Sequence, residues 1–158
     1  MAIVELSDLL RLLAGGRRLL GLDVGSKTVG LAVSDGGLRV ATPVDTLRRT
    51  KLGPDAAALE KLIAERGIGA LVVGLPVNMD GSEGPRCQSV RQFADNLLGH
   101  IEIPIAFWDE RLSTAAVTRT MIDADLSRRR RGQVVDKLAA AYILQGALDA
   151  LARQSELS

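Results

Sequence analysis

The sequence of 158 residues has very little of the side chains on which many enzymes and nucleic-acid-binding proteins depend. Its single cysteine, Cys87, cannot form an internal disulfide bond, so nothing indicates an oxidising compartment. Its single histidine, His100, argues against zinc sites built on histidine and against histidine-activated nucleophiles. Aromatic residues make up only 3%, too few for a row of rings on which single-stranded bases stack.

A strong charge bias and a long apolar run are also missing. The 20 Lys and Arg residues and the 19 Asp and Glu residues leave a net charge of +1, so any surface that attracts nucleic acid must be local. No apolar segment approaches the roughly 20 residues that a membrane-spanning helix needs. The remaining composition, 47% hydrophobic and 25% charged, is typical of one globular domain. We therefore expect a soluble cytoplasmic protein.

The first part of the chain predicts a helix and then three antiparallel strands. Leucines recur at helical spacing over residues 3–13 and stop at Gly15, a good helix terminator. Short apolar or alternating segments joined by tight turns then predict a meander. Pro43 in the third strand indicates an edge position. The three strands are expected at residues 19–24, 29–34 and 39–47.

The second part alternates predicted helices with buried strands, which implies parallel pairing through crossover helices. We therefore expect an α/β fold in which helices flank a five-stranded mixed sheet, an antiparallel meander followed by parallel strands. The arginine run 128–131, followed by Gly132, is expected to form a mobile basic loop. Strands are expected at residues 70–74 and 103–108, and helices at 54–66, 88–98, 113–123 and 133–152.

Asp23 lies inside an apolar predicted strand, where a charge is costly unless it is paired or bound to a metal ion. Gly25 and Gly30 flank the next turn and leave its backbone open to a phosphate or a metal-bound ligand. Lys27 in that turn is a candidate phosphate ligand. The alternatives are that Asp23 caps a turn and that Lys27 is simply solvated.

Two further acids are candidate site residues. Glu110 is the second residue after the strand predicted at 103–108, at the end where α/β sheets usually build their sites. The alternative is that Asp109 and Arg111 form a local ion pair with Glu110 solvated. Asp136 shares a helical face with small apolar residues at positions 140 and 147, so its carboxylate is either a helix-start charge or a site residue.

Asp23, Glu110 and Asp136 are far apart in the sequence, but the expected fold can bring them together. Oxygen-only ligands favour Mg²⁺ or Mn²⁺ over zinc. Paired ions of this kind hydrolyse phosphodiesters without histidine or cysteine. The sequence therefore predicts that these three residues are metal ligands and catalytic residues.

Candidate substrate ligands surround these acids. Asn78 and Ser82 lie in a polar loop after a predicted strand, although that loop can also be a plain connector. The arginine run can bind backbone phosphates, although such runs are often solvated. The full candidate set is Lys27, Asn78, Ser82, Arg111, Arg128, Arg129, Arg130 and Arg131.

Four ordered motifs over about residues 18–151 carry a family resemblance. They are Gly21–Gly25 with Gly30 and Ser34–Asp35, the loop Gly74–Ser82, Asp109–Arg111, and Asp136 with Ala139–Ala140. Together they resemble the YqgF/RuvX family of pre-16S ribosomal RNA nucleases, which is related to Holliday-junction resolvases. The resemblance implies a ribonuclease H-like fold, the same three acids, Mg²⁺ or Mn²⁺, and maturation of the 5′ end of small-subunit ribosomal RNA.

The sequence departs from the family pattern at two places. Thr28 stands where many members carry arginine, which removes a phosphate contact unless Lys27 substitutes. Ser113 stands in the position of a common threonine and keeps its hydroxyl. Residues 1–17 lie outside the pattern. We expect a helical extension over 1–17, the nuclease domain over 18–152 and a tail over 153–158.

The predicted function is that of a metal-dependent nuclease that processes the 5′ end of pre-16S ribosomal RNA. One alternative is a DNA endonuclease of the Holliday-junction resolvase type, which would need a dimer to cut two strands symmetrically. Another is a non-catalytic nucleotide-binding or ribosome-assembly adaptor. We expect RNA as the partner, with structured DNA as the alternative, no membrane, and a monomer or weak homodimer.

Overall fold

The computed structural model of the chain describes residues 2–13, 15–112 and 128–157, with side chains described up to residue 112 and over 137–155. Its centre is a six-stranded mixed sheet in the order β1-β6-β5-β2-β3-β4. The strands are β1 Ile3–Val4, β2 Arg18–Val24, β3 Thr28–Ser34, β4 Ala41–Arg48, β5 Ile68–Leu75 and β6 Ile105–Asp109. The helices are η1 Leu6–Asp8, α1 Leu9–Leu12, α2 Leu52–Arg66, α3 Pro85–Leu98, η2 Glu110–Leu112 and α5 Arg128–Leu157.

The predicted meander is confirmed. Strand β3 pairs antiparallel with both β2 and β4, and β4 is an edge strand as its proline indicated. Strand β5 then pairs parallel with β2, and β6 pairs parallel with β5. Because β2, β5 and β6 run in the same direction, their carboxyl ends meet at one edge of the sheet, which we call the carboxyl edge.

The prediction of five strands is wrong, because the N-terminal segment adds a sixth. Ile3 and Val4 pair parallel with Ile105 and Ala106 of β6, and the backbone N–H of Ile105 donates to the carbonyl of Ala2 at 3.1 Å. Two residues are too few to show the alternating pattern of a strand. The leucine spacing over residues 3–13 therefore indicated only a helix. The pairing covers one edge of the sheet. The division of the chain into an extension, a domain and a tail stays a prediction.

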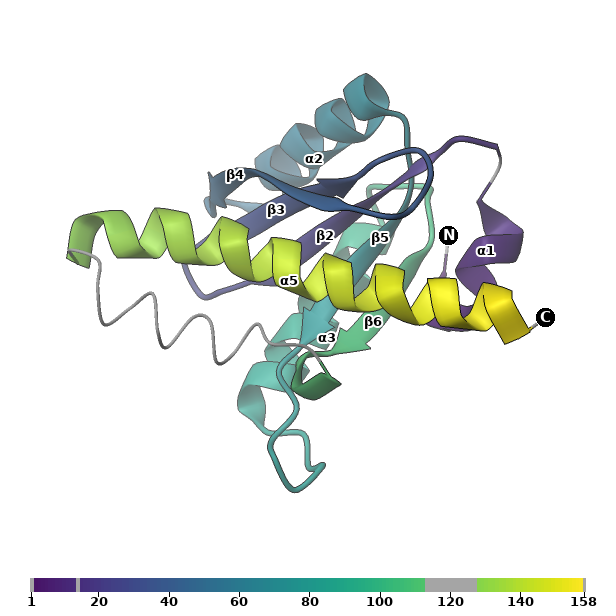
Figure 1. Cartoon of the computed structure of the whole chain (residues 1–158). Coiled ribbons are helices and arrows are strands. Elements are labelled where there is room, and N and C mark those ends of the chain that lie inside the picture. Colours follow the sequence, from purple (N-terminus) through teal and green to yellow (C-terminus); the bar gives the residue numbers. More distant parts are fainter. Residues whose placement is uncertain (1, 14, 113–127, 158) are drawn as a thin grey trace.

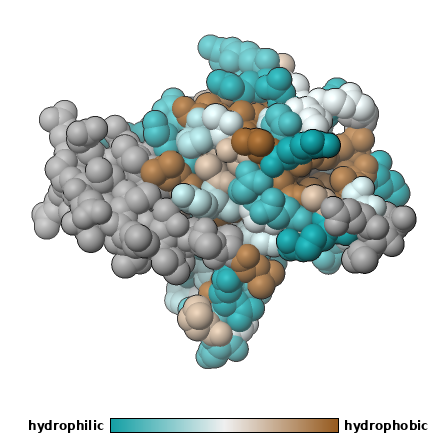
Figure 2. Space-filling view, viewed as in Figure 1, coloured by the Kyte–Doolittle hydropathy of each residue, from teal (hydrophilic) through white to brown (hydrophobic). Residues whose placement is uncertain are grey.

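Helices cover both faces of the sheet (Figure 1). Helix α5 crosses one face and packs against β2, β3 and β4, and α2 and α3 pack on the opposite face. The outward side of α5 carries a band of hydrophilic residues (Figure 2). No helix among the described residues has the length and the apolar character to cross a membrane.

The last helix begins earlier than predicted. The backbone is helical from Arg128 onward, so the expected basic loop is wrong at residues 128–131. Arginine is a good helix former, and the single glycine at position 132 costs only about 1 kcal/mol within a helix that is stabilised by its long packed part. The helix predicted at 113–123 lies outside the described residues.

The terminal residues of α2 and α3 set their bounds. Helix α2 ends at Gly67, which has a left-handed backbone with φ of 65° that residues with a Cβ rarely adopt. Helix α3 begins at Pro85, three residues before the predicted start at Gln88, because proline suits the first helical position. Because β5 ends at Leu75 and α3 begins at Pro85, the loop 76–84 and the start of α3 lie at the carboxyl edge.

Helix α5 approaches β2 closely because Gly21 has no side chain. A Cβ built there would lie 2.8 Å from the Cβ of Leu144 and 3.1 Å from the carbonyl oxygen of Ala140. Strand β5 repeats this arrangement at Gly74, where a Cβ would lie 2.5 Å from the Cδ1 of Ile143. The two glycines therefore set how deep α5 sits on the sheet.

Replacing Gly21 with alanine is expected to force α5 outward and to lower the free energy of unfolding by about 1–3 kcal/mol, the usual cost of overpacking a core. Urea unfolding followed by circular dichroism measures the change. Gly53→Ala is the matched control, because a Cβ there meets nothing within 4 Å. An unchanged midpoint for Gly21→Ala would contradict the close approach.

Candidate functional site

Asp23 lies near the carboxyl end of β2 and is only 4% exposed. It pairs with Gly30 of β3. Because side chains alternate along a strand, Asp23 faces the same side as Gly21, the side on which α5 packs. The sequence therefore buries a carboxylate between the sheet and α5.

Glu110 lies in the same region but follows β6, which is separated from β2 by β5. It begins η2 directly after β6, is half-buried, and its Oε1 lies 2.8 Å from the position of a Cβ on Gly74. The last pair between β2 and β5 is Leu22 with Val73, so the next residues along, Asp23 and Gly74, are neighbours at the carboxyl edge. Two of the three predicted acids thus flank Gly74 on the face that α5 covers.

Asp136 is described through its backbone only, which belongs to α5. Position 136 is one helical turn before Ala140, whose carbonyl oxygen lies against Gly21. Its side chain lies outside the described residues, so its meeting with the other two acids stays a prediction. Among the described side chains, no group of three His, Cys, Asp or Glu residues is placed to hold a metal ion.

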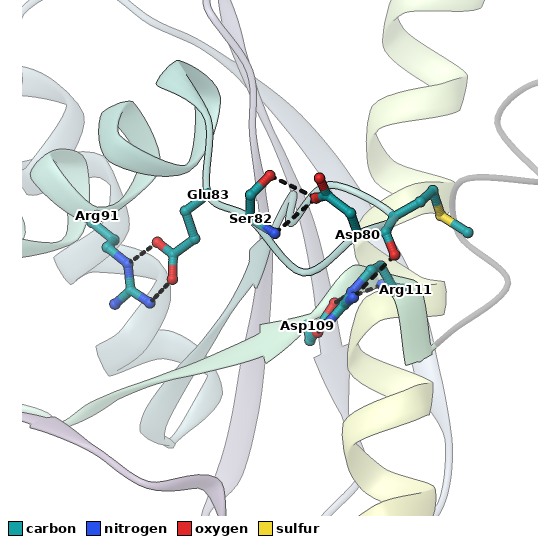
Figure 3. Close-up of polar contacts among 7 residues, drawn as sticks. Asp80, Ser82, Glu83, Arg91, Asp109 and Arg111 are labelled. Carbon is teal, nitrogen blue, oxygen red and sulfur yellow. Dashed lines mark hydrogen bonds and ion pairs between the residues drawn. The ribbon is translucent and has the colours of Figure 1, made fainter.

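The loop 76–84 at the carboxyl edge is held by its own polar side chains (Figure 3). The Oδ1 of Asp80 accepts hydrogen bonds from the backbone N–H of Ser82 at 2.9 Å and from its hydroxyl at 2.6 Å. Asn78 Nδ2 donates to Ser82 Oγ at 3.0 Å. The Ser82 hydroxyl lowers the pKa of Asp80, so this carboxylate is ionised at neutral pH. Asn78 and Ser82 therefore shape the loop.

Arg111 is paired within the same edge (Figure 3). Its Nη2 lies 2.7 Å from Asp109 Oδ2, and its Nη1 donates to the carbonyl of Met79 at 3.4 Å. The hydrogen bond from Arg111 lowers the pKa of Asp109. The local ion pair considered from the sequence is thus present, whereas Glu110 is half-buried against Gly74 instead of fully solvated. Arg111 fastens the loop to the segment that carries Glu110.

A second ion pair holds the start of α3. Arg91 Nε and Nη2 donate to the two carboxylate oxygens of Glu83 at 2.6 and 2.8 Å (Figure 3). Arg91 lowers the pKa of Glu83. The pair joins the end of the loop to the second turn of α3, so side-chain contacts hold the loop at Met79 and at Glu83.

The basic candidates have different settings. Lys27 is exposed in the turn between β2 and β3. The side chains of Arg128–Arg131 lie outside the described residues. Sequence reasoning missed Arg49, whose Nη1 donates to the carbonyl oxygen of Gly25 at 2.6 Å. No sequence signal indicated it, because the contact joins the end of β4 to a turn 24 positions earlier.

The chain is similar to known proteins in both sequence and fold. A family profile described as "RuvX: Holliday junction resolvase" matches residues 17–150. A protein of Paramagnetospirillum magneticum named "Putative pre-16S rRNA nuclease" is 61% identical, over 94% of this chain and 96% of its own length. A protein of Roseobacter denitrificans with the same name is 56% identical, over 94% of this chain and 93% of its own length.

Two solved structures share the architecture. The chain of "T. thermophilus RuvC in complex with Holliday junction substrate" has a TM-score of 0.53 at 16% identity, covering 85% of this chain and 94% of that one. The chain of "Thermus thermophilus RuvC structure" has a TM-score of 0.51 at 16% identity, covering 87% and 96%. At this identity the likeness concerns the fold alone. The predicted ribonuclease H-like α/β fold is confirmed.

The Asp109–Arg111 pair predicts a pH-dependent contribution to stability. Because the folded protein lowers the pKa of Asp109, its ionised form stabilises the fold above the unfolded pKa of about 3.9, and this stabilisation is lost as pH falls through the folded pKa. Asp109→Asn is expected to lower the free energy of unfolding by up to about 1 kcal/mol at pH 7.

Urea titrations between pH 3 and pH 7 measure this difference, which should shrink below about pH 4. Glu60→Gln, which changes an exposed carboxylate on α2, is the control and should show little difference at any pH. A difference between wild type and Asp109→Asn that stays constant down to pH 3 would contradict the role of the ion pair.

Proposed function

The chain belongs to the RuvX family, and we propose that it is a metal-dependent nuclease that hydrolyses phosphodiester bonds at the 5′ end of pre-16S ribosomal RNA. The observation that carries this proposal is the buried carboxylate of Asp23 beside Gly74, with the carboxylate of Glu110 on the other side of that glycine. Two carboxylates at the edge where α/β sheets build sites offer oxygen ligands for a divalent cation.

The donor set fits a hard divalent cation. Asp23 and Glu110 offer carboxylate oxygens, the ligands that Mg²⁺ and Mn²⁺ prefer, and we propose Asp136 as the third. Positions 136, 140, 143 and 147 lie on one stripe of α5, and Ala140, Ile143 and Ala147 are fully buried, which supports an inward position 136. When bound, Mg²⁺ or Mn²⁺ supplies an activated water and stabilises the leaving oxygen of the phosphodiester.

The protein's own residues prepare this chemistry in two ways. Asp23 and Glu110 fix the ligand oxygens on rigid strand ends, so little reorganisation is needed. Packing by α5 excludes water from the side of the site that lies under the helix. Hydrolysis breaks one phosphorus–oxygen bond, and the elements of water end on the two products, so no further reactant is required.

We assign the remaining candidates to the path of the RNA strand. Lys27 and the four arginines 128–131 are proposed to contact backbone phosphates, because Lys27 is exposed in the turn that follows Asp23 and the arginines begin the helix that carries position 136. Asn78, Ser82 and Arg111 are proposed to act by holding the loop 76–84 beside that path, since each has an internal hydrogen bond. A few such phosphate contacts can position the RNA strand, although the net charge of the whole chain is only +1.

RNA is favoured over a four-way DNA junction as the substrate. The relatives at 56–61% identity are named for pre-16S ribosomal RNA, whereas the structure bound to a Holliday junction is only 16% identical. A resolvase also needs two active sites related by a twofold axis. A precursor RNA and a four-way DNA junction should therefore be compared directly as substrates.

Asp23→Asn and Glu110→Gln are each expected to reduce cleavage of a 5′-labelled pre-16S RNA by at least about 100-fold, because loss of a ligand should exceed the 10–100-fold typical of outer-shell partners. Chelation of divalent ions should have the same effect on the wild type, and Mg²⁺ or Mn²⁺ should restore cleavage. Denaturing gel electrophoresis measures the products.

Asp45→Asn, on the exposed edge strand, is the matched control and should cleave like the wild type. Equal cleavage by the wild type and both acid variants would assign the activity to another site or to a contaminant. Cleavage of the DNA junction but not of the RNA would replace the proposed substrate.

Replacing Arg128–Arg131 with alanine, which keeps helix propensity, is expected to weaken RNA binding and to flatten its salt dependence. The slope of log Kd against log salt should decrease by about 0.7 for each RNA phosphate that the variant no longer neutralises. Fluorescence anisotropy at several salt concentrations measures the slope. An unchanged slope would remove this part of α5 from the RNA path.

A further inference from the structure

A small basic cavity lies at the carboxyl edge on the face opposite to the acids. Its volume is about 80 Å³, and it is lined by Ser26 of the β2–β3 turn, Arg49 after β4, and Arg86 and Ser89 of the first turns of α3. Ser26 is three residues after Asp23, so their Cα atoms are at most about 11 Å apart. The cavity thus adjoins the proposed catalytic site across the β2–β3 turn.

Contacts on both sides hold the guanidinium of Arg49 in this cavity. Its Nη1 donates to the carbonyl of Gly25 at 2.6 Å, and its Cζ lies 4.8 Å from the ring centre of Phe93. The backbone N–H of Arg49 donates to the carbonyl of Lys27 at 2.8 Å. The turn and the guanidinium therefore form one preorganised unit.

The two arginines of the cavity retain capacity to bind an anion. A guanidinium has five N–H donors, and the bond to Gly25 uses one donor of Arg49. Within the part of the chain that the structure describes, neither Arg49 nor Arg86 forms an ion pair with a carboxylate. The start of the 14-residue helix α3 adds a favourable dipole for an anion.

A larger polar cavity continues from this one. It measures about 290 Å³, shares Arg49 and Ser89 with the first, and extends along α3 past Gln92 to Asn96. Asp55 also lines it, but the backbone N–H and the hydroxyl of Thr50 donate to its carboxylate. A small basic cavity joined to a larger one with amide side chains matches a phosphate followed by a nucleoside.

We propose that Arg49 and Arg86, with the hydroxyls of Ser26 and Ser89, bind a backbone phosphate that flanks the scissile bond of the nucleic-acid substrate. The adjoining cavity then receives the attached nucleoside. This subsite rests on the proposed nuclease function and extends it. It directs the nucleic-acid strand from the α5 face of the sheet over the β2–β3 turn to the α3 face. Charge-assisted bonds from two guanidiniums fix one phosphate and so set the register of the strand.

The test measures RNA binding in the full chain carrying Asp23→Asn, so that cleavage does not consume the probe. The probes are a single-stranded RNA from the 5′ end of pre-16S RNA and a DNA of the same sequence. Adding Arg49→Gln and Arg86→Gln together is expected to weaken binding of both probes by about 10- to 100-fold and to reduce the salt slope by about 0.7, the value for one single-strand phosphate.

Arg153→Gln is the matched control. It removes the same charge from an exposed position near the C-terminal end of α5, far from the carboxyl edge, and should change affinity less than twofold (Figure 1). Arg86→Gln alone is the second variant, because Arg86 is exposed and its replacement leaves the bond between Arg49 and Gly25 intact. Thermal unfolding of every variant checks the fold.

Unchanged affinity and salt slope in both the double and the single variant would overturn the subsite. Weakening of RNA binding without weakening of DNA binding would also overturn it, because a phosphate contact is common to both. Failure of the nuclease proposal gives a different result: no cleavage by the wild type, with binding still dependent on Arg49 and Arg86. Cleavage by the wild type together with unchanged binding in these variants would instead retain the nuclease and remove the subsite.

Discussion

The depth at which α5 packs against β2 and β5 is the constraint on which the rest of the structure depends. Gly21 and Gly74 leave room for the helix, and a Cβ at either position would overlap a side chain of α5. The space at Gly74 also receives the carboxylate oxygen of Glu110, one strand away from the buried Asp23. The same missing side chains therefore allow the helix to cover the sheet and allow two acids to approach each other beneath it.

The carboxyl edge is shaped by short-range ionic contacts whose groups are ionised at neutral pH. Arg111 joins Asp109 to the loop 76–84, and Arg91 joins the end of that loop to α3. These contacts are partly exposed, so each contributes little to stability. Their effect is positional, because they hold a long polar loop beside the segment that carries Glu110.

Charge of opposite sign lies on the two sides of the β2–β3 turn. Asp23 faces α5, whereas Arg49 and Arg86 line a cavity on the side of α3. A net charge of +1 conceals this separation, because it averages over the whole chain. A polyanion that is cut at the acids needs a cation there and basic groups beside it, and the proposed subsite supplies the basic groups without neutralising the acids.

The sequence by itself determined the meander, the parallel strands and the candidate acids, because hydrophobic periodicity and a carboxylate in an apolar strand are local signals. It also indicated the Asp109–Arg111 pair, whose members are two residues apart. Only the tertiary structure decided that Ile3 and Val4 complete the sheet, that Gly74 lies between Asp23 and Glu110, and that Arg49 reaches Gly25. These contacts join residues far apart in the sequence, and they depend on strand register and helix depth, which no local pattern encodes.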